Sequence, residues 1–348
     1  MNFSLTDEQN DLLNSLSNTI KIYDDNYWLD CDNASRYPIE FVDTMAKGGW
    51  LGIAMPTNYG GSNLGVTEAS LMMMSIAEKG GMSAASSIHM NIFGPSSIVK
   101  FASKSQKTNW LPSIINGQTK MCFAVTEPDT GLDTTRLKTK AVKNNDHYII
   151  NGRKIWTSTA QITNKIMIIV RTSERNKKMP TEGLSLFYTD FNRENIEARI
   201  ISKMGRAAVD TNELFIDNLK VPAGDLIGEE GKGFSYLIHS LNPERILVAA
   251  EAYGIAKNAL ERAVKYANER IVFDRKIGQN QSIQHPLAES WAKLEALKLL
   301  ILKAANLYDN NLPCGVESNA AKYLAAEYGM EICKQAIATH GGMGYAKE

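Results

Sequence analysis

The stretch best suited to binding chemistry is residues 121–141, where a strand pattern ends in a turn. Small and larger apolar residues alternate up to Thr126, as in a strand. Residues 127–131, EPDTG, then predict a turn, because proline fixes φ and glycine can take a positive φ. Such a turn presents backbone N–H groups and small hydroxyls that can hydrogen-bond a ligand. An ordinary β-turn is the alternative for this stretch taken alone.

A second stretch, residues 148–158 (YIINGRKIWTS), places Asn151 and Gly152 between two apolar segments. An Asn-Gly pair in this setting is the strongest short-range hairpin signal, so we expect a hairpin there. At their spacing, TEP..G.D from Thr126 and YIINGRK.W.S together resemble the acyl-CoA dehydrogenase family, where the two segments form the flavin bed. The resemblance extends from LTDEQ at residues 5–9 to GGMGYAKE at residues 341–348.

The resemblance implies FAD as the cofactor. Val125 and Thr126 would offer a backbone edge to the heteroatoms of the ring, Trp156 a flat apolar neighbour, and Ser158 a hydroxyl near the reactive nitrogen N5. A core aromatic would be the better explanation of Trp156 standing alone. The family pattern also assigns two further residues to the cofactor site, Phe123 and Gly131.

A third segment, residues 267–275, resembles a family segment whose Arg and Phe reach the FAD of a neighbouring subunit. The matching residues are Arg270, whose guanidinium can bond two pyrophosphate oxygens, and Phe273. Gly341 and Gly342 would let the backbone approach the adenosine end. The resemblance therefore implies a homodimer or homotetramer. A solvated helix face is the alternative for the charged residues.

Three residues depart from the family pattern. Asp274 replaces the usual glycine and adds a negative charge near the phosphates. Ala338 replaces a glutamine that helps to hold the adenosine end, and Leu132 replaces a serine that contacts the substrate near the thioester. These departures keep open a non-catalytic alternative, a CoA-thioester-binding or assembly subunit.

The chemistry implied by the resemblance needs a carboxylate. Removing a proton next to a thioester carbonyl requires a base within hydrogen-bond reach and donors on the carbonyl oxygen. Glu348 and Glu244 both match family positions for the base, and Arg245 matches an arginine that supports the substrate site. We predict Glu348 as the base, because Arg245 would lower the pKa of Glu244. An exposed pair in the first turn of a helix is the alternative for Glu244 and Arg245.

The resemblance thus implies dehydrogenation of an acyl-CoA to a trans-2-enoyl-CoA, with electrons passing to an electron-transfer flavoprotein. An acyl-CoA oxidase or a flavin monooxygenase on the same fold is the second alternative. Relatives continue beyond the position of Glu348, so we also expect the C-terminal helical region to be incomplete.

Composition narrows the function further. The 348 residues contain 38 Lys and Arg and 38 Asp and Glu, which gives no net field favouring nucleic acid. No run of about 18 apolar residues suggests membrane insertion. Four scattered cysteines indicate reduced thiols and a cytoplasmic location, and the five histidines lack metal-ligand spacing. The glycines of GGMG (341–344) and of 228–233 fit neither a dinucleotide nor a phosphate-loop motif.

The elements predict an α+β chain. Residues 1–118 form an N-terminal all-α domain, 119–229 a central antiparallel β-barrel or sandwich, and 230–348 a C-terminal helical bundle. Thr6 and Gln9 form a capping box, and Thr67 caps an apolar helix that Gly80 and Gly81 stop. Apolar runs predict strands at 166–170, 184–188 and 214–216, with turns at 144–146, 151–152 and 217–218. Long helices are expected at 237–267, 283–301 and 320–338, the second with Trp291 on its buried face.

Overall fold

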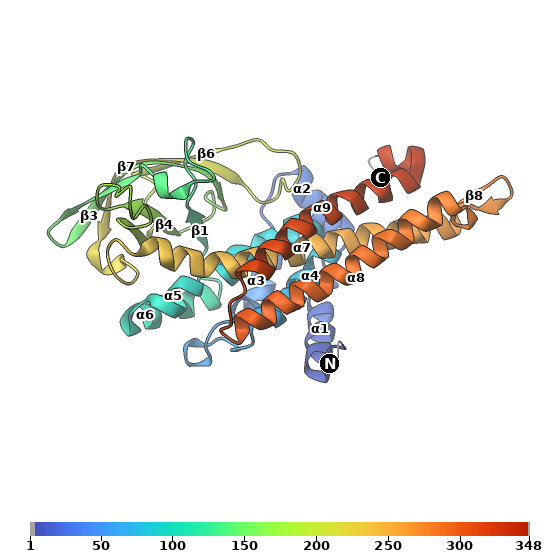
Figure 1. Ribbon diagram of the computed structural model, residues 1–348, viewed down its shortest axis with the longest axis horizontal. Coiled ribbons are helices and arrows are strands. Elements are labelled where there is room, and N and C mark those ends of the chain that lie inside the picture. The colour runs from blue at the N-terminus through green and yellow to red at the C-terminus, as the bar shows by residue number, and fades with distance from the viewer. Residues whose placement is uncertain (1–3, 347–348) are drawn as a thin grey trace. The chain divides into compact units, whose positions relative to one another are not determined.

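The structure is a computed structural model, and it describes residues 4–346 (Figure 1). Helices occupy both ends of the chain and strands occupy the middle, so the predicted α–β–α order is confirmed. The chain forms two compact units, and each unit is built from segments that are not consecutive in the sequence. The helical unit contains the described residues up to Trp28, Gly65–Ala85 and the residues from Asn242 onward, and the sheet unit contains Leu29–Leu64 and Ser86–Leu241.

The helical unit is built mainly from long helices. Its elements are α1 (Asp7–Ile20), the first part of α4 (Val66–Phe93), most of α7 (Gly233–Glu269), the hairpin strands β8 (Ile271–Val272) and β9 (Arg275–Lys276), α8 (Gln281–Asp309) and α9 (Gly315–His340). The capping box of α1 is confirmed, since Gln9 N donates to Thr6 Oγ1 and Thr6 N to Gln9 Oε1. The predicted apolar face of α8 is buried from Leu287 to Ile301, except that Trp291 is exposed. Ser290 occupies the buried position there, one residue earlier.

Helix α4 begins and bends where the sequence indicated, but its cap comes from elsewhere. The carboxylate of Asp309, at the end of α8, accepts from Val66 N (2.7 Å), Thr67 N (2.9 Å) and Thr67 Oγ1 (2.6 Å). Thr67 is therefore a capped residue rather than the cap. Gly81 takes φ 65° and ψ −161°, which breaks the helix, yet helical structure resumes and continues to Phe93.

The sheet unit holds shorter helices and seven strands. The helices include α3 (Ile39–Lys47), α5 (Ser96–Phe101) and α6 (Lys104–Ile115), while α2 (Asp25–Asn33) begins in the helical unit. The strands are β1 (Met121–Ala124), β2 (Lys140–Asn144), β3 (His147–Ser158), β4 (Lys165–Arg171), β5 (Leu184–Asp190), β6 (Ile196–Ile200) and β7 (Thr211–Pro222). Their order is β1-β4-β2-β3-β7-β6, with β5 also on β4. Most pairs are antiparallel as predicted, whereas β1 and β2 each pair with β4 in parallel.

The predicted hairpin at Asn151 and Gly152 is wrong, because β3 runs straight through both residues. Asn151 instead lies opposite a bulge in β7, where Asn218 has φ 50° and donates its N–H to Asn151 Oδ1 at 2.7 Å. A side chain at Gly152 would bring a Cβ within 2.5 Å of Thr139 Oγ1, so glycine serves close packing. The expected turn at 217–218 is this bulge, while the turn at 144–146 does join β2 to β3.

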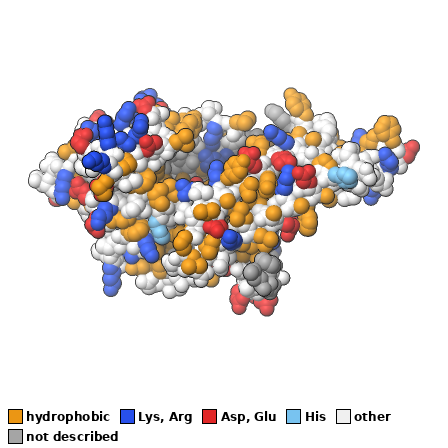
Figure 2. All heavy atoms as spheres, viewed as in Figure 1, with side chains coloured by type: hydrophobic (Ala, Val, Ile, Leu, Met, Phe, Trp, Pro, Cys, Tyr) orange, Lys and Arg blue, Asp and Glu red, His pale blue; other side chains and the backbone are white. Residues whose placement is uncertain are grey.

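Apolar residues pack on both faces of the sheet. One cluster includes Met121, Met167 and Leu186 and joins helical residues such as Ile114, and the other includes Cys122, Ile166 and Phe187. Alternate residues of β1, β4 and β5 thus enter opposite clusters, as the two-residue period of a strand requires. On the face shown in Figure 2, charged side chains of both signs occur.

Candidate functional site

The structure brings the end of β1 and the middle of β3 together. Ile155 N donates to Thr126 O at 2.9 Å, so the predicted backbone edge lies beside the residue that precedes Trp156. Ile155 and Trp156 together oppose the single residue Glu213 of β7, which is a β-bulge. Bulges of this kind re-aim side chains and often lie next to active sites.

Trp156 has a strained backbone conformation and an exposed side chain. Its φ is 63°, a strained value for a bulky side chain, and 59% of its surface is exposed. Its strain and exposure are unlike those of a core aromatic, so that alternative is wrong. The adjacent Thr157 is buried, and its hydroxyl has no hydrogen-bond partner among residues 4–346. A strained, exposed indole beside an unsatisfied hydroxyl fits a ligand site better than a structural role.

A buried ion pair that the sequence analysis missed supports this edge. Lys154 is 0% exposed, and its Nζ donates to Val125 O at 2.9 Å and to Glu127 Oε1 at 3.0 Å. The carboxylate also accepts from Lys138 N (2.6 Å) and Thr139 N (3.0 Å). The sequence contains one signal for it, the phase of Lys154 with Tyr148 and Ile150 along β3, which the usual exposure of lysine outweighs.

The two charges shift each other's titration. Burial lowers the pKa of Lys154 to about 8, although the Glu127 carboxylate partly offsets that effect. Burial raises the pKa of Glu127, but the Lys154 ammonium and the hydrogen bonds from Thr139 and Lys138 outweigh it and leave that pKa below its ordinary value. The pair is therefore ionised near neutral pH.

The EPDTG turn is confirmed, and Glu127 and Thr130 exchange backbone hydrogen bonds across it. Gly131 at its end and Leu132 just beyond it lie exposed, and the Leu132 side chain is fully accessible to solvent. The other predicted bed residues lie on the strands. Phe123 is half-buried with its ring 5.3 Å from that of Phe93, and Ser158 Oγ accepts from Arg206 Nη2 at 3.3 Å. Arg206, which has φ 53° and was not predicted, adds a positive charge beside this hydroxyl.

In the helical unit, Glu244 and Arg245 are half-buried residues well inside α7. The alternative of an exposed first-turn pair is therefore wrong. Arg245 Nη1 donates to Asn242 Oδ1 at 3.1 Å, which directs the guanidinium back along the helix. Glu348, the predicted base, lies outside the described residues.

The segment with Arg270 and Phe273 ends α7 and enters a small hairpin. Val272 pairs with Arg275, so Phe273 and Asp274 are its two loop residues, with φ 53° and 58°. A type I′ turn requires a positive φ at both loop positions, and glycine is favoured at such positions. Phe273 is 93% exposed at the tip, and Arg270 is exposed too.

The glycines after α9 have separable roles. Gly341 has φ 59° and ends the helix, which explains glycine at that position without a ligand. Nothing lies within 4 Å of a Cβ built on Gly342, whereas one on Gly344 would lie 2.3 Å from Ile337 O. The open space at Gly342 is compatible with the predicted close approach to a ligand.

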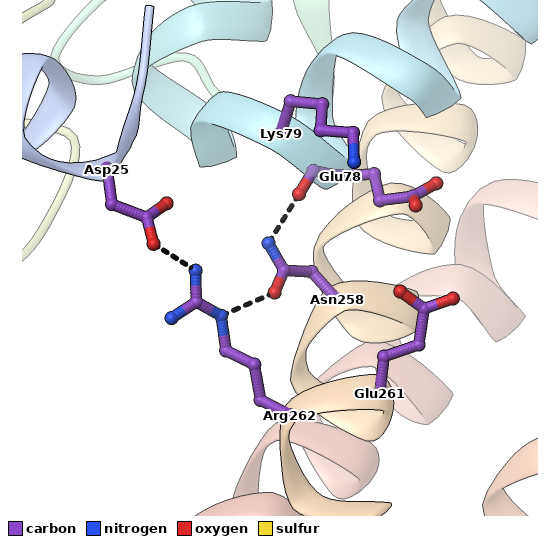
Figure 3. A pocket seen from close by; sticks show the side chains of 6 residues that line it. All are labelled: Asp25, Glu78, Lys79, Asn258, Glu261 and Arg262. Carbon is purple, nitrogen blue, oxygen red and sulfur yellow. Dashed lines mark hydrogen bonds and ion pairs between the residues drawn. The ribbon is translucent and has the colours of Figure 1, made fainter. Parts of the chain in front are cut away.

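A separate hollow of about 250 Å³ in the helical unit is lined by charged residues (Figure 3). Arg262 bonds Asp25 Oδ2 and Asn258 Oδ1, each at 2.6 Å, and Lys257 bonds Glu78 at 2.8 Å. Because both signs are present and engaged with one another, the hollow does not favour a charged ligand. Within residues 4–346, no group of three or more His, Cys, Asp or Glu could hold a metal ion, and no helix is long and apolar enough to cross a membrane.

Comparison with known proteins places this geometry in a family. The descriptions "Acyl-CoA dehydrogenase, N-terminal domain", "middle domain" and "C-terminal domain" match residues 6–118, 122–219 and 231–348. The chain is 34% identical to a caffeyl-CoA reductase–Etf complex subunit of Acetobacterium woodii, covering 91% of this chain and 83% of that protein. It is 35% identical to a 3-(aryl)acrylate reductase of Clostridium sporogenes, with 91% and 84% covered.

Comparison with solved structures gives the same family. Butyryl-CoA dehydrogenase from Megasphaera elsdenii superposes with a TM-score of 0.94 at 30% identity, over 99% of this chain and 91% of that one. These findings leave the expected loss of a C-terminal segment without support. The chain belongs to the acyl-CoA dehydrogenase family and is an oxidoreductase of the flavoenzyme type that this fold carries.

Proposed function

We propose that the protein uses FAD to dehydrogenate an acyl-CoA thioester to the trans-2-enoyl-CoA and passes the electrons to an electron-transfer flavoprotein. The observation that carries the proposal is the pairing of the Thr126 backbone edge with the exposed, strained Trp156. The Etf complex named for the Acetobacterium woodii relative supports the choice of electron acceptor.

The residues present fit a flavin. A flat heteroaromatic ring needs a flat neighbour and polar groups at its edge, and Trp156, Thr126 and Ser158 supply both. Arg206 adds a positive charge beside Ser158. Arg270 would meet the pyrophosphate and Gly342 the adenosine end, which makes the cofactor FAD rather than FMN. When bound, FAD accepts the electrons that leave the substrate.

The chain's own residues would handle the proton and the thioester. We assign Glu348 as the base that removes the proton next to the carbonyl, with Glu244 as the substitute. Arg245 would support the substrate. Leu132, exposed beside the EPDTG turn, would contact the substrate through apolar surface where other family members use a hydroxyl.

A second candidate is the same site run in reverse, reducing a 2-enoyl-CoA. The reductase names of two relatives at 34% and 35% identity favour it. Two-electron exchange between the same carbons uses the same base and the same backbone donors, so geometry does not separate the directions. Dehydrogenation of a fatty acyl-CoA would give the protein a role in fatty-acid β-oxidation.

We also propose a cytoplasmic location and domain boundaries after residues 118 and 229. The four cysteines are free thiols, which supports a reducing, cytoplasmic compartment. Domain boundaries after residues 118 and 229 are supported by the element ends, because α6 ends at Ile115, β1 begins at Met121 and α7 begins at Gly233.

The test is an absorbance spectrum of the purified protein, followed by anaerobic titration with acyl-CoA thioesters of graded length. We expect a yellow protein whose released flavin is FAD, and bleaching of the visible band by a preferred chain length. Bleaching by acyl-CoA supports dehydrogenation, whereas recolouring of the reduced protein by an enoyl-CoA alone supports reduction. Rapid reoxidation in air would favour an oxidase or a monooxygenase, and absence of flavin after reconstitution with FAD would overturn the proposal.

The base is tested by substitution. Glu348→Gln should abolish bleaching while leaving FAD bound, and Glu244→Gln should slow it. The reverse order of effects would transfer the role to Glu244.

A further inference from the structure

Lys154 and Glu127 place two charges in the interior of the sheet unit, next to the edge formed by Val125 and Thr126. Lysine is almost never fully buried unless it is paired. Even a paired charge is costly to bury, because the loss of hydration can exceed the attraction between the partners. Stability alone is therefore a poor explanation of this ion pair.

The position of the ammonium explains it better. Lys154 Nζ holds the carbonyl oxygen of Val125 at 2.9 Å, and all described peptide bonds are trans. In a trans peptide the C=O and the following N–H point in opposite directions. The N–H of Thr126 is therefore aimed away from Lys154.

Two more contacts lock the same edge. Ile155 N holds the next carbonyl, that of Thr126, at 2.9 Å. The Glu127 carboxylate then ties the end of this edge to Lys138 N and Thr139 N, just ahead of β2. Consecutive peptides from 125 to 127 are thus fixed against two other segments of the sheet unit.

We propose that Lys154 and Glu127 are positioning residues that hold the Thr126 N–H ready to donate to the polar edge of a flat heteroaromatic ligand. The inference rests on the proposed function, which supplies FAD as that ligand. Both side chains act through the peptide that joins Val125 to Thr126 and not by touching the ligand.

The decisive variant replaces both charges at once. Lys154→Met with Glu127→Gln keeps similar volumes and removes both charges of the buried pair together, so the fold should survive. Tyr148→Phe is the matched control. Tyr148 is another buried residue of β3, and the change removes its 2.6 Å hydrogen bond to Glu230.

Two readouts separate positioning from general stability. In the double variant the apparent Kd for FAD, from fluorescence titration of the apoprotein, should rise roughly tenfold, as expected for one misdirected hydrogen bond. The Ile155 amide should exchange its hydrogen faster in the same variant without ligand. Tyr148→Phe should change neither value.

Parental FAD affinity together with parental exchange at Ile155 in the folded double variant would overturn the inference. A parent protein that takes up no FAD would overturn the proposed function instead, and exchange at Ile155 would then decide the inference alone. If the double variant does not fold, Lys154→Met alone replaces it, because it removes the bond to Val125 O while Glu127 keeps its bonds from Lys138 N and Thr139 N. Parental affinity in that variant would overturn the inference equally.

Discussion

At the scale of single residues, Glu127 links the site to pH. Its folded pKa lies below its ordinary value of 4.5, so the carboxylate contributes stability that is complete above that value. This contribution is lost as the pH falls from that value through the folded pKa, because over this range the unfolded chain takes up a proton that the folded carboxylate does not.

We therefore expect the parent to lose more unfolding free energy than the variant Lys154→Met with Glu127→Gln between about pH 7 and pH 3.5. Lys154 stays protonated over this range, so the difference isolates Glu127. Urea unfolding at several pH values measures it. Glu194→Gln, an exposed glutamate ahead of β6, should follow the parent, and equal slopes for parent and double variant would contradict the assignment.

A second residue-scale prediction concerns Asp274. It occupies the second loop position of the type I′ turn with φ 58°, where glycine is free of strain. Asp274→Gly should stabilise the local hairpin by about 0.5–1 kcal/mol. Slower hydrogen exchange of the Val272 and Arg275 amides would show it, with Asp274→Asn as a control of similar backbone preference. Faster exchange in the glycine variant would mean that the aspartate makes a compensating interaction.

The candidate site shows what a single sequence can and cannot provide. Thr126 and Trp156 were predictable because motif spacing marked them. Lys154 was not, since a lysine in a strand is ordinarily exposed and only three-dimensional pairing with Glu127 makes its burial acceptable. Arg206 was missed because its contact with Ser158 joins residues 48 positions apart.

At the scale of elements, the cap of α4 is the clearest non-local feature. Asp309→Ala removes three hydrogen bonds to a charged acceptor, so we expect a loss of about 1–2 kcal/mol in unfolding free energy. Chemical denaturation measures the loss. Asn310→Ala is the control, because the Asn310 side chain, directly after α8, donates to Asn306 O of the same helix and not to α4. An equal effect of both changes would mean that the end of α8, rather than the cap, is responsible.

Element types were easier to predict than element ends and connections. The apolar periodicity of α8 and the capping box of α1 depend on neighbours three or four residues away, so the sequence contains them. The prediction of a hairpin at Asn151 and Gly152 is wrong because the same dipeptide also fits a strand opposite a bulge. Only the packing of Thr139 on Gly152 decides between the two.

At the scale of the whole molecule, the exposed surface of α9 indicates that copies of the chain associate. Exposed apolar side chains recur at every seventh residue, Val316, Tyr323, Met330 and Ile337. A seven-residue repeat is typical of a helix that packs along another helix. Together with the exposed Arg270 and Phe273, it supports the proposed homodimer or homotetramer.

We expect Tyr323→Glu to shift the protein toward monomers, because it places a charge in the middle of this apolar stripe. Sedimentation velocity measures the distribution. Lys322→Glu, the exposed neighbour outside the stripe, should leave the assembly unchanged. A parent that is already monomeric when saturated with FAD would remove the basis for the assembly.

The buried ammonium of Lys154 has a practical consequence. Acylating reagents attack the neutral amine, and Lys154 supplies it once opening exposes the side chain to solvent. Its complete burial keeps reagents out of the closed protein. Acylation of Lys154 therefore proceeds only when this part of the sheet opens, so the rate of mass gain at that residue counts opening events directly. The acylation rate of Lys154 is therefore a built-in measure of local opening of the sheet.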